Sequence, residues 1–480
     1  MATQSTAAAL KPSPAEQRVI AAAAAGAVCD FRVNNPAADD PARAETWGTE
    51  RALRADVLRA LCLGLRPDWP LDPRGVQVRG ARIDGALDLA AATVAVPLLF
   101  WDCAFTDAPI VRDATLKILS LVGSRLPGLV GDGLTVQSSL LLRGTRLSGE
   151  VRFLGAKIGG DLSCIKGSFE NPRGQALSAE SLTTGGNVFL RDGFRAAGEV
   201  RLLGAKIGGD LACSDGSFDN PGGVALSADG ADVRGGLFWR QLQAPPAGRV
   251  SLAHATVGVL ADDLQSWPGP GALNLSGFVY GAIAASSMTD AARRLDWLRR
   301  QDPQLFSPQP YEQLAKVLRQ MGHDDDARKI AIARKQALIA RSGNRASRLA
   351  RHLVLWPVGY GYRPGRALWS LLALIAFGTL IFSGPVGSGV MLPAKLGEAQ
   401  VTAYRACAAL PPGYPRFQPL VYAIDTALPI IDFHQEAWWL PDEADVRGFW
   451  TQVYLWLHIA LGWLLTTLGI AAVTGIIKRD

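Results

Sequence analysis

The chain contains an internal repeat, and this repeat restricts the possible folds more than any other feature. Residues 151–179 recur 49 positions later as residues 200–228, with 22 of the 29 residues identical. A Gly-Gly pair returns faster than the whole unit, and a short, mostly apolar run follows each pair. These pairs begin at Gly159, Gly185, Gly208 and Gly235. Short apolar runs separated by glycine at a period of about 25 residues are typical of a β-solenoid, in which each coil stacks on the preceding one.

The repeat region predicts a rod with glycine at its corners. Of the 51 glycines, 32 lie within residues 75–280. Glycine permits sharp corners where φ is positive, and roughly eight coils at about 4.8 Å each give a rod about 40 Å long. The pairs Asn171-Pro172 and Asn220-Pro221 are turn signals that predict loops leaving the rod. We therefore assign residues 75–280 to a β-solenoid, namely a right-handed parallel β-helix of the pentapeptide-like kind.

Two long uncharged runs near the C-terminus predict membrane-spanning helices. Residues 367–394 are 28 residues without a charge, and residues 448–477 are 30 residues in which His458 is the only titratable group. A spanning helix needs about 20 apolar residues, so both runs are long enough. The composition, 49% hydrophobic and 19% charged, agrees with a protein that is partly surrounded by lipid. We predict spans near 367–388 and 450–476.

The charges beside these spans predict the topology. Six arginines between residues 341 and 366 precede the first span, and Lys478 and Arg479 follow the second. The loop between the spans, residues 390–447, is acidic near its end. Because positively charged flanks stay in the cytoplasm, we expect a multi-pass protein of the plasma (inner) membrane with the 390–447 loop outside. Both termini and the solenoid are then cytoplasmic.

One segment of this loop, residues 417–436, is apolar enough to touch the bilayer but too short to cross it, and Pro429 interrupts it. It is either an amphipathic segment on the outer surface or a re-entrant segment. Irregular backbone at membrane depth requires cover by protein or water, so a re-entrant form would imply a homo-oligomer. In that case Asp425, Asp432 and His434 are the candidate pore-lining residues, with Asp425 the first to test.

Helical segments flank the solenoid. Apolar spacing over residues 46–65 predicts a helix that caps its first coil, within an N-terminal helical cap at 1–74. After the solenoid, residues 311–327 resemble one tetratricopeptide-like helix–turn–helix unit, within a helical linker at 281–350. The basic residues that end this linker fit lipid headgroups better than nucleic acid, because a span follows them. The membrane domain then occupies residues 351–480.

No residue pattern in the chain indicates catalysis. The sequence lacks GxSxG, Walker A, HExxH and clustered Cys/His motifs, and the glycines at 359–365 have the wrong spacing for a dinucleotide fingerprint. Cys164 and Cys213 occupy equivalent positions of the repeat, which predicts inward cysteines in a stacked ladder. We therefore assign no catalytic, cofactor-binding or metal-binding residue and expect no cofactor.

The chain resembles a known family in three features. These are the run GAKIGGDL at residues 155–162, the pair of C-terminal spans, and the closing run HIALGWLLTTLGIAAVTGIIKRD from His458. They are similar to actinobacterial membrane proteins with pentapeptide-like repeats, whose members are often labelled membrane-associated oxidoreductases. The resemblance covers nearly the whole chain. It implies a membrane-bound solenoid, and the label implies an oxidoreductase.

Three functions remain open from the sequence. The first is a membrane-anchored cytoplasmic β-solenoid that acts as an interaction or sensing scaffold, with the lipid bilayer and a protein as partners. The second is a homo-oligomeric two-span channel gated by the solenoid, and the third is the oxidoreductase that the family label implies. The net charge of +6 is modest for 480 residues, so nucleic acid is not an expected partner.

Overall fold

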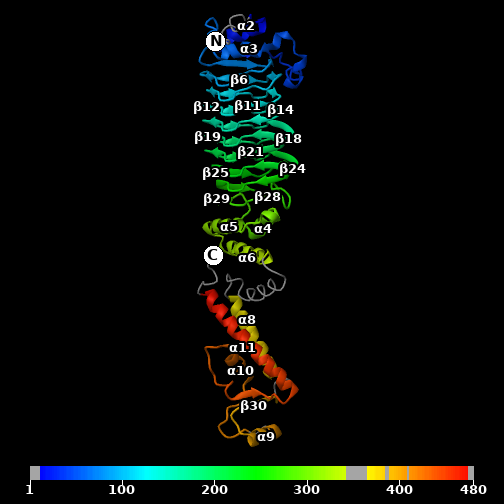
Figure 1. Ribbon diagram of the computed structural model, residues 1–480, viewed down its shortest axis with the longest axis vertical. Coiled ribbons are helices and arrows are strands. Elements are labelled where there is room, and N and C mark those ends of the chain that lie inside the picture. Colours follow the sequence, from blue (N-terminus) through cyan, green and yellow to red (C-terminus); the bar gives the residue numbers. More distant parts are fainter. Residues whose placement is uncertain (1–10, 342–364, 384–388, 408–409, 474–480) are drawn as a thin grey trace. The chain divides into compact units, whose positions relative to one another are not determined.

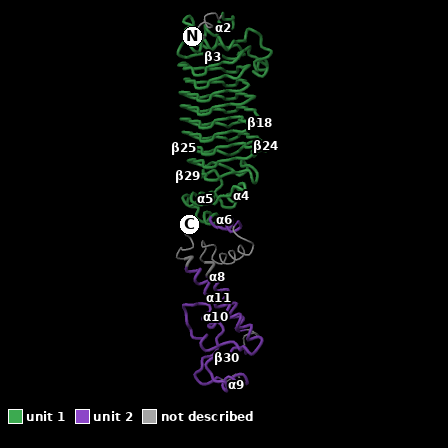
Figure 2. The backbone as a smooth tube through the Cα atoms, viewed as in Figure 1, with its two compact units in different colours: residues 1–330 green, residues 331–480 purple. Residues whose placement is uncertain are grey.

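The structure is a computed structural model that describes residues 11–341, 365–383, 389–407 and 410–473 (Figure 1). The chain divides into two compact units, Met1–Ile330 and Ala331–Asp480 (Figure 2). The repeats lie in the first unit and both apolar runs lie in the second.

The first unit is a parallel β-solenoid, which confirms the predicted coil-on-coil architecture. Strands of successive coils pair in parallel, and one position can be followed from coil to coil through these pairings. This series of paired residues spans nine coil-to-coil steps. Its members are Val76, Leu98, Leu119, Leu140, Leu162, Val188, Leu211, Leu237, Leu260 and Ile283. The sequence therefore underestimated the number of coils by about one. Each coil takes between 21 residues, as from Leu98 to Leu119, and 26 residues, as from Leu162 to Val188.

The strands form four ladders along the solenoid. The first contains β3 (Val76–Arg79), β6 (Leu98–Trp101), β9 (Leu119–Ser120), β13 (Leu140–Leu141), β17 (Leu162–Ser163), β20 (Val188–Phe189) and β23 (Leu211–Ala212). The second contains β5 (Thr93–Val94), β8 (Thr115–Leu116), β12 (Thr135–Val136), β16 (Lys157–Ile158), β19 (Thr183–Thr184) and β22 (Lys206–Ile207). These two ladders merge in the longer strands β25 (Asp232–Trp239), β27 (Thr256–Asp262) and β29 (Val279–Ile283).

The other two ladders form the second sheet. The third contains β2 (Ala52–Arg54), β4 (Arg82–Asp84), β7 (Ala104–Phe105), β10 (Arg125–Leu126) and β14 (Arg146–Leu147), and the fourth contains β11 (Leu129–Val130) and β15 (Val151–Arg152). They merge in β18 (Ser168–Ser178), β21 (Arg195–Arg201), β24 (Ser217–Ser227) and β26 (Ala247–Ser251), and β28 (Leu273–Asn274) follows.

The Gly-Gly pairs allow close approach between coils and do not form the positive-φ corners. Gly159, Gly185 and Gly208 are outside the set of residues with positive φ, which corrects our expectation for these pairs. A Cβ on Gly185 would collide with the carbonyl oxygen of Gly159 in the preceding coil, and a Cβ on Gly208 would collide with that of Gly185. Several corners with positive φ are not glycine, among them Asp113 and Lys166.

The Asn-Pro pairs lie within long strands as bulges, whereas the sequence predicted loops. Asn171 lies in β18, where the register to β21 shifts between Glu170 and Gln175. The Asn171 side-chain amide donates a hydrogen bond to the carbonyl of Gln175 at 2.9 Å, and Asn220 makes the same bond to Val224 at 2.8 Å. Each asparagine thus closes its own bulge, and the strands continue on both sides of it.

Aromatic side chains stack through the interior of the last coils. Their ring centroids are 5.0 to 5.8 Å apart, within the range of favourable aromatic pairs. The stack consists of Phe169, Phe194, Phe218, Trp239, Trp267 and Trp297. Because Trp297 belongs to the helix after the last coil, the stack joins the solenoid to its C-terminal cap.

The N-terminal end of the solenoid is covered by α2 (Pro14–Ala25), β1 (Cys29–Asp30), the 3₁₀ helices η1 (Pro41–Thr46) and η2 (Thr49–Arg51), and α3 (Ala55–Cys62). The single helix predicted over 46–65 is wrong in its first half. Residues 52–54 instead form β2, which pairs in parallel with β4 and buries Leu53 completely. Tertiary pairing with the first coil therefore prevails over the helical spacing of the apolar residues.

The C-terminal end is covered by α4 (Ala291–Arg299), η3 (Pro303–Leu305), α5 (Gln309–Gln320) and the first part of α6 (Asp324–Arg341). Helices α5 and α6 follow each other at the position of the predicted helix–turn–helix, and their likeness to a tetratricopeptide unit stays a prediction. Gln313 of α5 donates to the carbonyl of Tyr280 in the last coil at 2.7 Å. The boundary between the two compact units falls after Ile330, inside α6, whereas the predicted linker extended to residue 350. Residues 342–350 lie outside the described chain.

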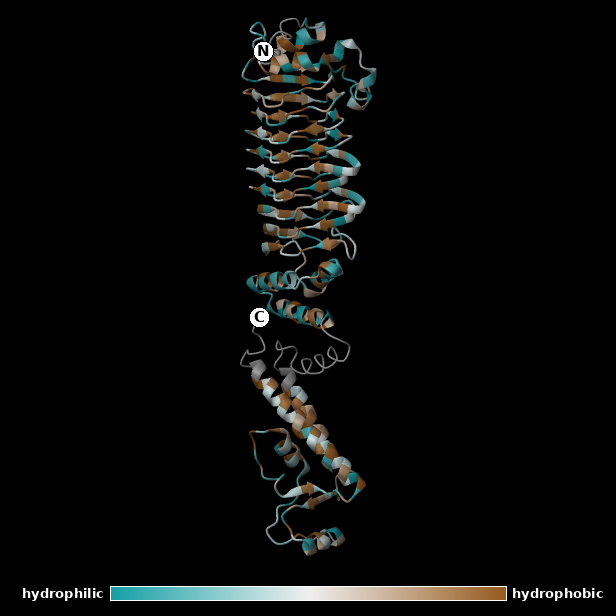
Figure 3. Ribbon diagram, viewed as in Figure 1, coloured by the Kyte–Doolittle hydropathy of each residue, from teal (hydrophilic) through white to brown (hydrophobic). Residues whose placement is uncertain are grey.

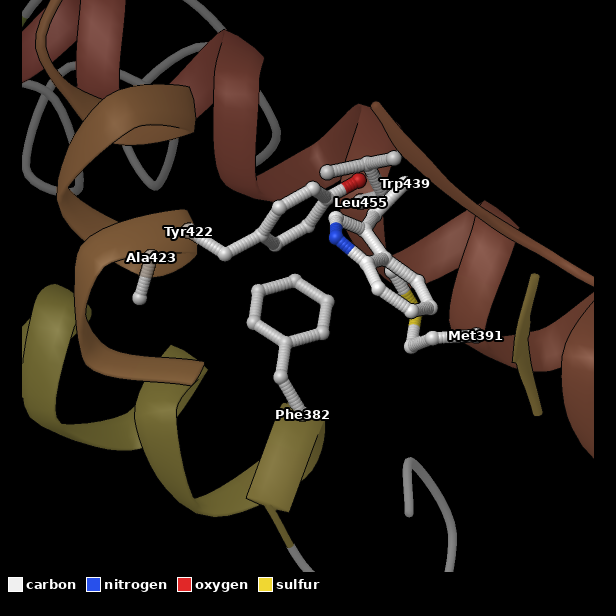
Figure 4. Close-up of a cluster of buried hydrophobic side chains, with 6 residues drawn as sticks. All are labelled: Phe382, Met391, Tyr422, Ala423, Trp439 and Leu455. Atoms are coloured by element: carbon white, nitrogen blue, oxygen red, sulfur yellow. The ribbon is translucent and has the colours of Figure 1, made fainter. Parts of the chain in front are cut away.

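The second unit contains α8 (Gly365–Ser383), β30 (Met391–Pro393), α9 (Glu398–Cys407), α10 (Pro419–Ala427), β31 (Trp439–Pro441) and α11 (Val446–Val473). Strands β30 and β31 pair antiparallel. The segment between α8 and α11, residues 389–445, is a folded lobe rather than a simple loop. We call it the aromatic lobe, because Tyr422 and Trp439 pack in its core against Phe382 of α8 and Leu455 of α11 (Figure 4).

Candidate membrane anchor and binding groove

Helix α11 exposes its apolar side chains along its length. Leu457, Leu461 and Trp463 are 57%, 45% and 55% exposed, and α8 and α11 are among the most hydrophobic elements of the described chain (Figure 3). By length and composition Val446–Ile470 can cross a membrane, and it is the one such helix among the described residues. The apolar part of α8, Leu368–Ser383, is shorter. The core helix of a soluble protein would bury most of such a surface, whereas α11 leaves these side chains exposed within the described chain.

His458 connects α11 to α10 inside the second unit. Its side chain is fully buried, and its Nε2 lies 3.0 Å from the carbonyl oxygen of Ala423 while its Nδ1 lies 3.1 Å from the Tyr454 hydroxyl. A carbonyl can only accept, so Nε2 donates and Nδ1 accepts from Tyr454. Gly378 of α8 makes room for the ring, because a Cβ there would lie 2.5 Å from Cε1 of His458. The histidine is therefore a structural contact among three helices.

The three candidate pore-lining residues do not share one site. Asp425 is buried, and its two carboxylate oxygens accept hydrogen bonds from the backbone N–H groups of Phe433 and Glu436. Asp432 and His434 are exposed and pair with each other through Nδ1 of the histidine. Asp425 thus holds the turn after α10, and the other two residues face outward from that turn.

The cysteines of the first unit belong to its interior. Cys164 and Cys213 are fully buried, which confirms the prediction of inward cysteines, and burial raises the pKa of both thiols. Burial also raises the pKa of Cys62 and Cys103 to about 12. Protonated, enclosed thiols are poor nucleophiles and poor metal ligands. Among the described residues there is no group of three or more His, Cys, Asp or Glu side chains that could hold a metal ion.

A ladder of polar side chains explains the residue that follows each of the first three Gly-Gly pairs. Asp161 accepts hydrogen bonds from the backbone N–H and the amide of Asn187, at 2.7 and 3.0 Å. Asn187 accepts from the N–H of Asp210 at 2.8 Å, and Asp210 accepts from the N–H of Gly236 at 2.7 Å. We missed this ladder in the sequence, although the recurrence of Asp or Asn after Gly-Gly was its signal.

A buried ion pair ties the last coils to α4. Arg294 donates to both carboxylate oxygens of Asp262 at 2.8 Å, and neither side chain is exposed. Trp267 donates its indole N–H to the same carboxylate at 2.9 Å. The two charged residues are 32 positions apart, so no local sequence pattern could have paired them.

A cavity of about 290 Å³ lies beside η1 at the N-terminal end of the solenoid. Two of its arginines are already engaged: Arg82 donates to the carbonyl of Trp47 at 2.8 Å, and Arg125 donates to that of Ala42 at 3.1 Å. These hydrogen bonds hold the segment around η1 against the sheet. The cavity is therefore a packing gap between this segment and the solenoid.

A groove of about 200 Å³ lies beside β26, near the C-terminal end of the solenoid. Within β26, only Val250 and Ser251 pair with β28, so residues 247–249 have no strand partner on that side within the described chain. Both apolar and polar side chains line the groove: Val250, Leu273 and Ser227 are buried, whereas Arg249 and Leu305 are exposed. Its lining is Val224, Ser227, Asp229, Arg249, Val250, Ser251, Gly271, Ala272, Leu273, Asn274, Asp302 and Leu305.

Comparison with known proteins finds no matching protein family, no matching curated protein and no matching solved structure. The glycine cluster at 359–365 and most of the basic stretch before the first span lie outside the described residues, apart from Gly365 at the start of α8.

Proposed function

We propose that this protein is a membrane-anchored β-solenoid that acts as an interaction or sensing scaffold on the cytoplasmic face of the plasma membrane. The observation that carries the proposal is the exposure of the apolar side chains of α11 in a chain that also builds a solenoid capped at both ends. Lipid would cover α11, and the solenoid would present its faces to the cytoplasm. The basic flanks of the two apolar runs support this orientation.

The groove beside β26 is the surface that we assign to a protein partner. An extended segment of the partner could pair with the free edge at residues 247–249, as in β-strand addition. The apolar part of the lining would accept alternate side chains, and the polar side chains of Arg249, Asp229 and Asp302 would fix their register. The proposal therefore specifies an extended peptide.

The anchor is tested by placing a charge on the exposed face of α11. We expect Leu461→Arg to oppose insertion by about 2.5–3.5 kcal/mol, because an arginine at the centre of a span is costly. The measurement is the fraction of full-length protein that stays in membranes after alkaline carbonate extraction. Val33→Arg is the matched control, since Val33 is an exposed apolar residue of the first unit. If Leu461→Arg behaves like Val33→Arg, α11 does not face lipid.

The groove is tested by site-specific crosslinking in cells. A photoreactive amino acid at Arg249 is expected to give a discrete protein adduct, whereas the same group at Arg195, an exposed arginine of β21 away from the groove, should give none. Filling the groove by Ala272→Phe should remove the adduct while the protein stays in the membrane. Equal labelling from Arg249 and Arg195, or an adduct that survives Ala272→Phe, would contradict the assignment.

The pore is the second candidate, favoured by the exposure of the ionisable Asp432 and His434 beside apolar helices. Ion flux into vesicles that is reduced by Asp432→Asn would favour the pore over the scaffold. The oxidoreductase implied by the family label predicts a bound flavin or haem, which would be visible in the absorbance spectrum of the purified protein.

A further inference from the structure

We propose that residues 419–436 form a re-entrant hairpin, in which α10 descends to the middle of the bilayer and the chain returns to the same side. This inference rests on the proposed membrane anchoring. Its tip, residues 428–431, would lie at the level where α8 and α11 are half-way across, where a second copy of the chain must cover its irregular backbone.

The contacts between α8 and α11 define the apolar layer. Gly378 lies against His458, and the ring of Phe382 lies 5.7 Å from that of Tyr454, so the two helices run antiparallel. At equal rise per residue, the two ends of α8 fall opposite about residues 453 and 471 of α11. The apolar part of α8, Leu368–Ser383, has a length of about 24 Å, somewhat less than the roughly 30 Å of a hydrocarbon core, and Arg366 lies just before it.

The contacts of α10 then give its depth. The carbonyl of Ala423 faces His458, and a Cβ on Gly462 would meet the carbonyl oxygen of Ala427. Helix α10 therefore runs in the same direction as α11, and its last residue lies beside Gly462, the midpoint of the stretch that α8 covers. By the same register α10 begins opposite about residue 454 of α11, near one boundary of the apolar layer, and stops half-way.

The turn after α10 pairs part of its own backbone, which irregular chain at membrane depth requires in addition to cover by protein or water. The N–H of Leu428 donates to the carbonyl of Ile424 at 3.0 Å, and the N–H of Ile431 donates to the carbonyl of Leu428 at 3.2 Å. Pro429 has no N–H. The Asp425 carboxylate accepts hydrogen bonds from the backbone N–H groups of Phe433 and Glu436. The buried carboxylate therefore stabilises the return of the chain in the hairpin.

The surface of the hairpin changes from apolar to polar along the return. Ile430 is 76% exposed in the monomer, and Ile431 is also exposed, so this apolar tip needs cover by a second copy of the chain at membrane depth. The exposed pair Asp432–His434 follows, and because the neighbouring N–H groups of Phe433 and Glu436 bind Asp425, this pair lies inside the apolar layer and needs the same cover. The side chain of Gln435 then accepts a hydrogen bond from the N–H of Gln418, where α10 starts.

Depth-dependent fluorescence quenching tests the hairpin. Single-label variants of the full chain carry a polarity-sensitive fluorophore at Ile430→Cys, Leu461→Cys or Glu443→Cys, all with Cys407→Ser. They are reconstituted into phosphatidylcholine vesicles that contain spin-labelled lipid, with the quencher either in mid-chain or on the headgroup. We expect the labels at positions 430 and 461 to be quenched more strongly by the mid-chain spin label than by the headgroup spin label. The label at position 443 should be quenched more strongly by the headgroup spin label.

Two outcomes would overturn the inference, and they are distinguishable. If the label at position 461 is quenched mainly by the mid-chain spin label but the label at position 430 mainly by the headgroup spin label, residues 419–436 lie on the membrane surface. The proposed anchoring by α11 would then still hold. If neither label responds to quenchers in lipid, the proposed anchoring itself fails.

Discussion

Replacing Asp262 by alanine is expected to lower the free energy of unfolding of the solenoid by about 3–5 kcal/mol. The change leaves the guanidinium of Arg294 fully buried without its counter-charge, and it removes the acceptor of the Trp267 indole. The loss should be seen as a lower urea midpoint of the far-ultraviolet circular dichroism of the full chain in detergent. The physical cause is an unpaired charge in the interior, since the pair itself adds little to stability.

The controls separate this effect from ordinary ion-pair loss. Asp296→Ala breaks the exposed pair with Arg299 on the same helix and should cost less than about 1 kcal/mol. The double variant Asp262→Leu with Arg294→Met removes both charges and should regain most of the stability lost in Asp262→Ala. If the double variant is as unstable as the single one, the packing of this site matters more than its charge.

Gly185→Ala is expected to destabilise the solenoid by about 3 kcal/mol, the upper end of ordinary overpacking. The new Cβ would meet the carbonyl oxygen of Gly159, a backbone atom that cannot move without separating two coils. The same collision recurs between Gly208 and Gly185, so each step of the ladder is tight. The measurement is the thermal unfolding midpoint of the full chain in detergent.

Gly269→Ala is the matched control for this substitution. No atom lies within 4 Å of a Cβ built on Gly269, which is outside the set of positive-φ residues. Its replacement should change the free energy of unfolding by less than about 0.5 kcal/mol. If Gly185→Ala and Gly269→Ala lower the free energy of unfolding by similar amounts, the close approach of coils is not the reason for glycine at position 185.

Much of the candidate membrane site could be predicted from local composition, but the roles of its residues could not. The run that contains α11 could be identified from its uninterrupted apolar residues, which are numerous enough for a helix to cross a membrane. Asp425 was singled out as a possible ion contact, whereas its oxygens accept backbone N–H groups of residues 433 and 436. Such a partner is eight or more positions away, and only the closure of the turn brings it near.

The sequence by itself determined the solenoid, because identical coils must place identical residues at equivalent points, and the repeat of Gly-Gly and apolar pairs records that stacking. Tertiary structure alone decided three further features. It made residues 52–54 a strand through pairing with β4, joined Asp262 to Arg294, and placed α10 beside α11. Each depends on contacts between segments about 30 residues apart in the chain, and short-range spacing carries no information about such contacts.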